Sequence, residues 1–241
     1  MIRVLGVGDN VCDKYLHTKT IFPGGNALNV AVFAKMMGEE AGYLGTFGDY
    51  EVGKHVYSVA KQLGMDLSHC RMEKGPNGCA RVQLVDGERV FLPGNQGGIS
   101  REKPPVLTEL DEVYIGEYDL VHTSIHSFME SQLPVMDRAG KFISMDFSDR
   151  YNEEYLKHCC PYIDCGEISC GNMEESEIRR VMEQIIRFGC RHMVIATRGS
   201  KGALVLVDGR FYEQSPCLVK AKDTMGAGDS FGVKPPVVSR G

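Results

Sequence analysis

Short apolar runs that end in small residues alternate along this chain with segments whose apolar residues recur at the period of a helix. This alternation restricts the possible folds more than any other feature of the sequence. Runs typical of buried strands occupy residues 2–8, 41–48, 119–125, 141–148 and 192–197. Segments with apolar residues on one helical face occupy residues 26–37, 52–64 and 174–189. Strands alternating with helices predict a mostly parallel sheet covered on both faces, with ligands bound beyond the carboxyl ends of the strands.

Residues 80–92 (ARVQLVDGERVFL) interrupt this pattern. Apolar and polar residues alternate on both sides of Asp86 and Gly87, which predicts an antiparallel hairpin. We expect segments 11–22 and 78–93 to form a small β-sheet that lies over the main sheet as a lid. The open edge of this lid is a candidate homodimer interface, because unpaired strand edges bind other strands.

The composition favours a small-molecule ligand and a cytoplasmic location. A net charge of -5 argues against nucleic acid or an anionic membrane as the main partner. No apolar run approaches the roughly 18 residues of a membrane span, and Asp9 comes too early for a signal-peptide core. The nine cysteines include no C-x-x-C pair, which indicates reduced thiols. Without an evident linker or repeat, residues 1–241 are expected to form one domain.

Several common motifs are incomplete or absent. Gly6 and Gly8 begin a dinucleotide-binding G-x-G-x-x-G pattern, but Val11 stands at its third glycine. No G-x-x-x-x-G-K-[ST] phosphate loop occurs either, so a nicotinamide-dependent oxidoreductase and a P-loop enzyme are both disfavoured. His122 and His126 have no evident serine or cysteine partner, and structural hydrogen bonding is favoured over catalysis for both.

Two stretches near the N-terminus suit a polyhydroxylated ligand. In GGNALN (24–29), Gly25 allows close backbone approach while Asn26 and Asn29 supply donors and acceptors, although the same residues also suit an ordinary helix start. Asp9 and Asp13 follow the first predicted strand. Their carboxylates can accept hydrogen bonds from sugar hydroxyls, or they are exposed loop carboxylates.

Two later stretches suit a nucleotide and its metal ion. Thr197, Gly199 and Gly202 in TRGSKG (197–202) fit nucleotide phosphates, or merely a turn. Asn172 and Glu175 supply oxygen ligands for a hydrated Mg²⁺, or mark a solvated helix start.

The stretch GAGD (226–229) combines an anion cradle with a base. Gly226, Ala227 and Gly228 let backbone N–H groups approach an oxyanion, and Asp229 follows as a candidate general base. A helix starting here would place its positive end against the negative charge of a phosphoryl transition state. These features indicate phosphoryl transfer.

Taken together, GGNALNVAVFAKMMG, TRGSKGALV and DTMGAGDSF resemble the signature regions and the nucleotide loop of the pfkB, or ribokinase-like, carbohydrate kinases, in the same order. The resemblance runs from about residue 2 to 231 and implies a three-layer α/β/α sandwich with a mostly parallel sheet and a small β-sheet lid. Within the family, GDNVCD (8–13) and residues 145–164 look most like the kinases that act on fructoselysine.

The resemblance implies ATP-dependent phosphorylation of a primary sugar hydroxyl, here the C6 hydroxyl of fructoselysine. Asp229 would be the base and 226–228 the anion hole, while Asp13, Gly25 and Asn29 would hold the sugar. By the same resemblance the TRGSKG residues would flank ATP, and Asn172 with Glu175 would match the family's N-x-x-E magnesium motif.

The sequence departs from the family after residue 231. Family members continue with a long apolar helix, whereas GVKPPVVSRG (232–241) contains two prolines that disrupt a helix. We therefore expect the C-terminal helices of the family to be missing and ATP binding to be weakened. The alternatives are a remnant that binds sugar without catalysis, or a kinase for fructose, ribose or 2-keto-3-deoxygluconate.

Overall fold

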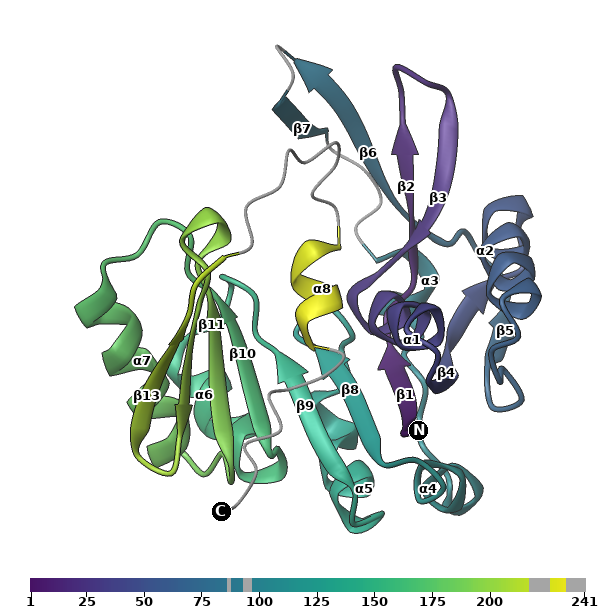
Figure 1. Cartoon of the computed structure of the whole chain (residues 1–241). Helices are drawn as coiled ribbons and strands as arrows, with labels where there is room; N and C mark the ends of the chain where they lie inside the picture. Colours follow the sequence, from purple (N-terminus) through teal and green to yellow (C-terminus); the bar gives the residue numbers. More distant parts are fainter. Residues whose placement is uncertain (86–87, 93–96, 217–225, 233–241) are drawn as a thin grey trace.

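A nine-stranded sheet forms the centre of the structure, a computed structural model that describes residues 1–85, 88–92, 97–216 and 226–232 (Figure 1). Its strands are β1 (Arg3–Gly8), β4 (Glu40–Gly48), β5 (Arg71–Glu73), β8 (Leu120–Ser124), β9 (Phe142–Asp146), β10 (Cys165–Ser169), β11 (Met193–Thr197), β12 (Ala203–Val207) and β13 (Arg210–Gln214). Their order is β13-β12-β11-β10-β9-β8-β1-β4-β5. All neighbours are parallel except β11–β12 and β12–β13, which confirms the predicted mostly parallel sheet.

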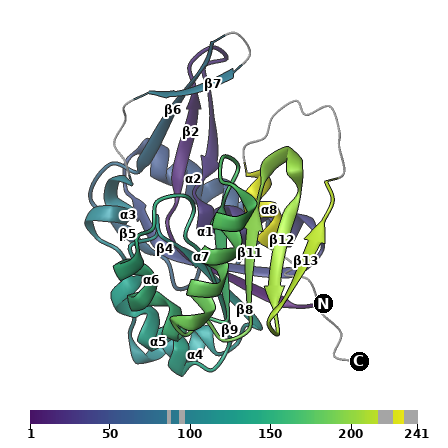
Figure 2. The same cartoon turned by 90° about the vertical axis from the view of Figure 1, so that its left-hand side faces the viewer.

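Helices cover both faces of this sheet, which confirms the three-layer prediction (Figures 1 and 2). One face carries α1 (Asn26–Met36), α2 (Glu51–Gln62) and α8 (Ala227–Gly232). The other face carries α4 (Glu109–Ile115), α5 (Leu133–Arg138), α6 (Glu153–Cys159) and α7 (Glu175–Arg187). The short α3 (Gly98–Glu102) packs near β4.

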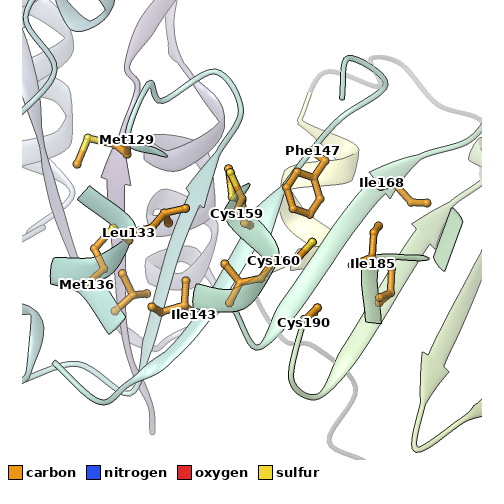
Figure 3. Close-up of a cluster of buried hydrophobic side chains, with 14 of the residues drawn as sticks. Met129, Leu133, Met136, Ile143, Phe147, Cys159, Cys160, Ile168, Ile185 and Cys190 are labelled. Carbon is orange, nitrogen blue, oxygen red and sulfur yellow. The ribbon is translucent and has the colours of Figure 1, made fainter. Parts of the chain in front are cut away.

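The core between the sheet and α4–α7 consists of interlocking apolar side chains (Figure 3). In α7, Ile178, Met182 and Ile185 recur at helical spacing and are all buried. They pack in the same cluster as the fully buried Ile143 of β9 and the Leu133 of α5. Each such side chain contributes about 1.5–3 kcal/mol when it is buried completely.

A second, four-stranded sheet projects from the main sheet (Figure 1). It contains β2 (Val11–Tyr15), β3 (Thr20–Gly24), β6 (Gly78–Val85) and β7 (Glu88–Leu92) in the order β3-β2-β6-β7. The β6–β7 pair is antiparallel, which confirms the hairpin, although its Asp86 and Gly87 lie outside the described residues. The predicted lid is thus present as a sheet, and dimer formation through its edge stays a prediction.

The sequence patterns miss the short helices α4, α5 and α6, because six or seven residues hardly reveal a helical period. One clear signal was available for α4. Thr108 accepts a hydrogen bond from the Asp111 N–H and donates its own N–H to the Asp111 carboxylate, which is a capping box.

The C-terminal stretch divides at residue 232. The helix predicted to start at the GAGD stretch is present as α8, whereas residues 233–241 lie outside the described part. The expected lack of further helices therefore stays a prediction. Within the described residues, no helix combines the length and apolar character that crossing a membrane requires.

Replacing Ile143 by alanine should lower the free energy of unfolding by about 2–5 kcal/mol, because it removes buried methyl groups and leaves a cavity. Urea unfolding followed by circular dichroism measures the change. Val106→Ala is the control, since Val106 is 73% exposed and its loss should cost less than about 0.5 kcal/mol. Equal effects of both substitutions would contradict this description of the core.

Candidate active site

Asp9, which follows β1, holds the first turn of α1. Its Oδ2 accepts a hydrogen bond from the Asn26 N–H (2.7 Å), and its Oδ1 accepts one from the Ala27 N–H (3.1 Å). The hydroxyls of Ser124 and Ser127 also donate to Oδ1, at 3.2 and 2.7 Å. Asp9 is 4% exposed. Its carboxylate therefore satisfies two of the free N–H groups at the positive end of the helix.

Gly25 allows α1 to begin this close to the end of β1. Its φ of 107° is unfavourable for other residues, and a Cβ there would lie 2.7 Å from the Asn10 Cα and 2.9 Å from the Asp9 carbonyl oxygen. With the helix start fixed in this way, Asn26 and Asn29 lie three residues apart on one side of α1.

The Asn26 side chain connects α1 to β8, β9 and α8. Its Nδ2 donates to the Asp146 Oδ2 (2.8 Å) and to the Asp229 Oδ1 (2.9 Å), while its Oδ1 lies 2.8 Å from the His122 Nε2. Asn29 donates from Nδ2 to the other oxygen of Asp229 (2.7 Å). Two amides of α1 thus orient a carboxylate 200 or more residues away in the sequence.

His122 is a structural member of this network. It is fully buried, and its Nδ1 lies 2.7 Å from the Ser144 Oγ. The Asn26 Oδ1 can only accept, so Nε2 donates to it; in a neutral ring Nδ1 then accepts from the serine hydroxyl. Burial accordingly lowers the pKa of His122 to about 4. The hydrogen bonding predicted for His122 is therefore present, and its lack of a catalytic role stays a prediction.

Carboxyl groups with raised pKa values lie next to the same network. Burial, reinforced by the charge of Asp229, raises the pKa of Asp146 to about 7. Burial and the charge of Asp146 raise the pKa of Glu167 on β10 to about 8. The Glu167 Oε1 lies 3.9 Å from the His122 Nδ1 and has no hydrogen-bond partner in the described structure. Burial also raises the pKa of Asp229, which makes it a better proton acceptor than an exposed aspartate.

Two pockets meet at the first turn of α8. Asp229 lines a pocket of about 620 Å³ between α1, the lid and the ends of β1 and β8, called here the sugar-side pocket. Ala227 and Gly228 line a pocket of about 800 Å³ beside β11–β13, called the nucleotide-side pocket. Gly226 lines a third cavity of about 510 Å³ under the lid. One helical turn thus borders two ligand-sized spaces.

The structure brings the residues predicted to bind a sugar together around the sugar-side pocket, beside Asp229. These residues are Asp9, Asp13, Gly25, Asn26 and Asn29. Asp13 comes from β2 of the lid and is 7% exposed. His126, the other candidate histidine, lines the same pocket.

The residues predicted to flank a nucleotide line the same pocket as part of the GAGD stretch. Thr197, Gly199 and Gly202 line the nucleotide-side pocket together with Ala227 and Gly228.

The candidate metal ligands lie elsewhere. Asn172 and Glu175, at the start of α7, are exposed and line neither of these two pockets. The Glu175 Oε1 accepts hydrogen bonds from Arg179 at 2.7 and 2.9 Å, and its Oε2 lies 3.4 Å from the Arg198 Nη1. Within the described ranges, no three His, Cys, Asp or Glu residues gather closely enough to hold a metal ion. An amide and a carboxylate nevertheless suit a hydrated Mg²⁺.

Sequence reasoning missed Asp146 and Glu167. Asp146 ends a buried strand that the sequence predicts, and a carboxylate at the carboxyl end of a parallel strand is a recognisable signal. Glu167 lies inside β10, which the sequence patterns did not identify, so no comparable signal was available.

Comparison with known proteins identifies the class to which this fold and site belong. Residues 5–232 match the model of the pfkB family of carbohydrate kinases, so the chain belongs to this family and the resemblance is confirmed. It is 38% identical over 231 residues to the fructosamine kinase FrlD of Bacillus subtilis, covering 95% of this chain and 81% of that protein. It is 33% identical over 225 residues to the fructoselysine 6-kinase of Escherichia coli, covering 93% of this chain and 84% of that protein.

Solved structures agree on the fold. Arabidopsis thaliana ribokinase, complexed with ribose and ATP, superposes with a TM-score of 0.79 at 19% identity, over 96% of this chain and 84% of that one. Giardia lamblia ribokinase gives a TM-score of 0.80 at 16% identity, over 96% and 80%. The ribokinase-like fold is therefore confirmed.

Glu167→Gln should change how stability depends on pH. Folded protein keeps the Glu167 proton up to a pKa of about 8, whereas the unfolded chain releases it above about pH 4. The free energy of unfolding of the wild-type protein should therefore decrease as the pH rises from 5 to 8. In Glu167→Gln this decrease should be smaller by on the order of 3 kcal/mol.

Urea unfolding at several pH values tests this expectation, with the exposed Glu154→Gln as the control. Parallel stability profiles for the wild-type protein and Glu167→Gln would show that the folded state does not retain this proton. Asp146 remains in both proteins but interacts with Glu167, so the difference between the two stability profiles reports the titration of this coupled pair.

Proposed function

We propose that this carbohydrate kinase transfers the γ-phosphoryl group of ATP to a primary hydroxyl of a fructosamine, namely the C6 hydroxyl of fructoselysine. The observation that carries the proposal is the position of α8, whose Asp229 borders the sugar-side pocket while Ala227 and Gly228 border the nucleotide-side pocket. The names of the two relatives at 38% and 33% identity support the substrate class.

Asp229 is the proposed general base. A carboxylate offers about four acceptor positions, and Asn26 and Asn29 use one on each oxygen. The remaining positions can accept the proton of a substrate hydroxyl. Because phosphoryl transfer depends mainly on alignment and charge stabilisation, a base that takes the proton late in the reaction is sufficient.

The first turn of α8 is the proposed anion hole. The Ser230 N–H donates to the Gly226 carbonyl oxygen (2.9 Å), and N–H groups ahead of it in a helix have no partner within that helix. These groups and the helix dipole favour negative charge on the transferred phosphoryl group. Gly226, Ala227 and Gly228 keep this approach free of large side chains.

The nucleotide-side pocket is the proposed ATP site, with Thr197, Gly199 and Gly202 beside the nucleotide. Asn172 and Glu175 are the proposed contacts to Mg²⁺, which usually keeps several waters and takes only one or two carboxylates. Such an ion would neutralise charge on the phosphates. The exposed position of Glu175 allows it to exchange its arginine partners for a hydrated ion.

Asp229→Asn should reduce ADP release by at least about 10²–10⁴-fold, because an amide cannot accept the hydroxyl proton. A coupled assay with ATP, Mg²⁺ and fructoselysine measures this, and the exposed Asp208→Asn should retain full activity. Undiminished turnover in Asp229→Asn would exclude Asp229 as the base. A wild-type protein that fructoselysine stabilises thermally but that releases no ADP would instead be a sugar-binding protein without catalysis.

Gly228→Val should impair the use of ATP without preventing folding. A Cβ at Gly228 meets no heavy atom within 4 Å, so the side chain extends into open space beside the proposed phosphate position. We expect the KM for ATP to rise at least about tenfold and Gly228→Ala to give a smaller increase. Calorimetric titration with fructoselysine should give equal affinity in all three proteins. An unchanged KM for ATP in Gly228→Val would place the phosphates elsewhere.

A further inference from the structure

The sugar-side pocket has a basic part that the phosphoryl transfer proposed above does not use. Arg101 on α3 and Arg150 beyond β9 both line it. Both side chains are exposed. Among the described residues, Arg101 forms no ion pair, and the one partner of the Arg150 guanidinium is its neighbour Asp149, at 3.8 Å. Two cationic groups thus face a pocket without a strong anionic partner.

The chain around these two arginines is held in unusual conformations. Phe128, which also lines the pocket, has a φ of 56°, and the Arg101 Cζ lies 5.4 Å from the centre of its ring. Ser148, two residues before Arg150, has a φ of 55°, and its N–H donates to the Asp146 Oδ1 (2.7 Å). Positive φ is uncommon outside glycine, and such residues cluster at ligand sites.

The charges divide the pocket into two chemically different parts. Asp9, Asp13 and Asp229 line it together with the two arginines. Carboxylates beside an empty space favour hydroxyl and ammonium groups, whereas a guanidinium binds a carboxylate through two parallel hydrogen bonds. A neutral sugar would use the acidic part alone. A sugar joined through an amine to an amino acid carries both charges that this pocket complements.

We propose that Arg101 and Arg150 form an anion subsite that binds the α-carboxylate of the amino-acid part of the substrate. This subsite deepens the proposed function, on which it rests, because it would distinguish fructoselysine from fructose and from fructosamines without a carboxylate. A dianionic sugar phosphate is the less suitable ligand, because three carboxylates in the same pocket repel a second negative charge.

Calorimetric titration without ATP tests the subsite separately from catalysis. The ligands are fructoselysine, the fructose adduct of 1,5-diaminopentane, which lacks only the carboxylate, and fructose 6-phosphate. The wild-type protein should bind fructoselysine at least about tenfold more tightly than the decarboxylated adduct. Arg101→Gln and Arg150→Gln should each weaken fructoselysine binding about five- to tenfold and leave binding of the adduct unchanged.

Two kinds of control variant sharpen this test. Arg180→Gln, at an exposed position of α7 away from the pocket, should bind every ligand as the wild-type protein does. Arg101→Lys and Arg150→Lys should recover part of the lost affinity, because they keep the charge without the planar fork. Recovery of this kind is not expected if the arginines serve only to hold the fold.

Equal wild-type affinity for fructoselysine and the decarboxylated adduct would overturn the subsite, as would tighter binding of fructose 6-phosphate or no binding of any of the three ligands. ADP release is then measured with the same sugars. If the carboxylate strengthens binding but no fructosamine yields ADP, the proposed function fails and the subsite stands. If both fructosamines are phosphorylated with equal KM, the function stands and the subsite fails.

Discussion

The carboxylate of Asp9 is the constraint on which the rest of the site depends. It accepts hydrogen bonds from the N–H groups of Asn26 and Ala27 and from two serine hydroxyls, and it thereby joins the end of β1 to the start of α1. Gly25 makes this junction sterically possible. Once α1 starts at that point, Asn26 reaches β8, β9 and α8 at the same time. The orientation of the proposed base is therefore determined by a buried acid that never needs to touch the phosphoryl group.

Differences in burial give the ionisable side chains around Asn26 different protonation states. Burial raises the pKa of Asp146 to about 7 and that of Glu167 to about 8, so near neutral pH Glu167 is mostly protonated and Asp146 is partly protonated, whereas exposed acids are ionised. Asp229 also has a raised pKa, but it borders a pocket and two amide donors support its ionised form. His122 stays neutral for the same physical reason, and so it can hold Asn26 in a single orientation.

Much of the fold could be predicted from the sequence, because buried parallel strands and long amphipathic helices have distinct periods. The helix of 174–189 and the hairpin around 86–87 are examples. For the candidate site, the sequence indicated Asp9, Asn26, Asn29 and Asp229 but neither Asp146 nor Glu167, and it did not indicate how these side chains are arranged. Nothing local in the sequence shows that Asn26 bridges Asp146 and Asp229, or that Glu175 pairs with Arg198. Such contacts arise from packing between distant elements, which local patterns do not record.

The hydrogen bond between Asn26 and Asp229 joins residues that are 203 positions apart in the chain. This separation determines when the contact can form during translation. At about 5–20 residues per second, a ribosome would need roughly 10–40 s after adding Asn26 to add Asp229. During that interval Asn26 gains its partner Asp146, but neither Asn26 nor Asn29 yet has the Asp229 carboxylate to which it donates. The contact that joins α8 to α1 therefore forms only late in synthesis, when residues near the C-terminus meet the helix near the N-terminus.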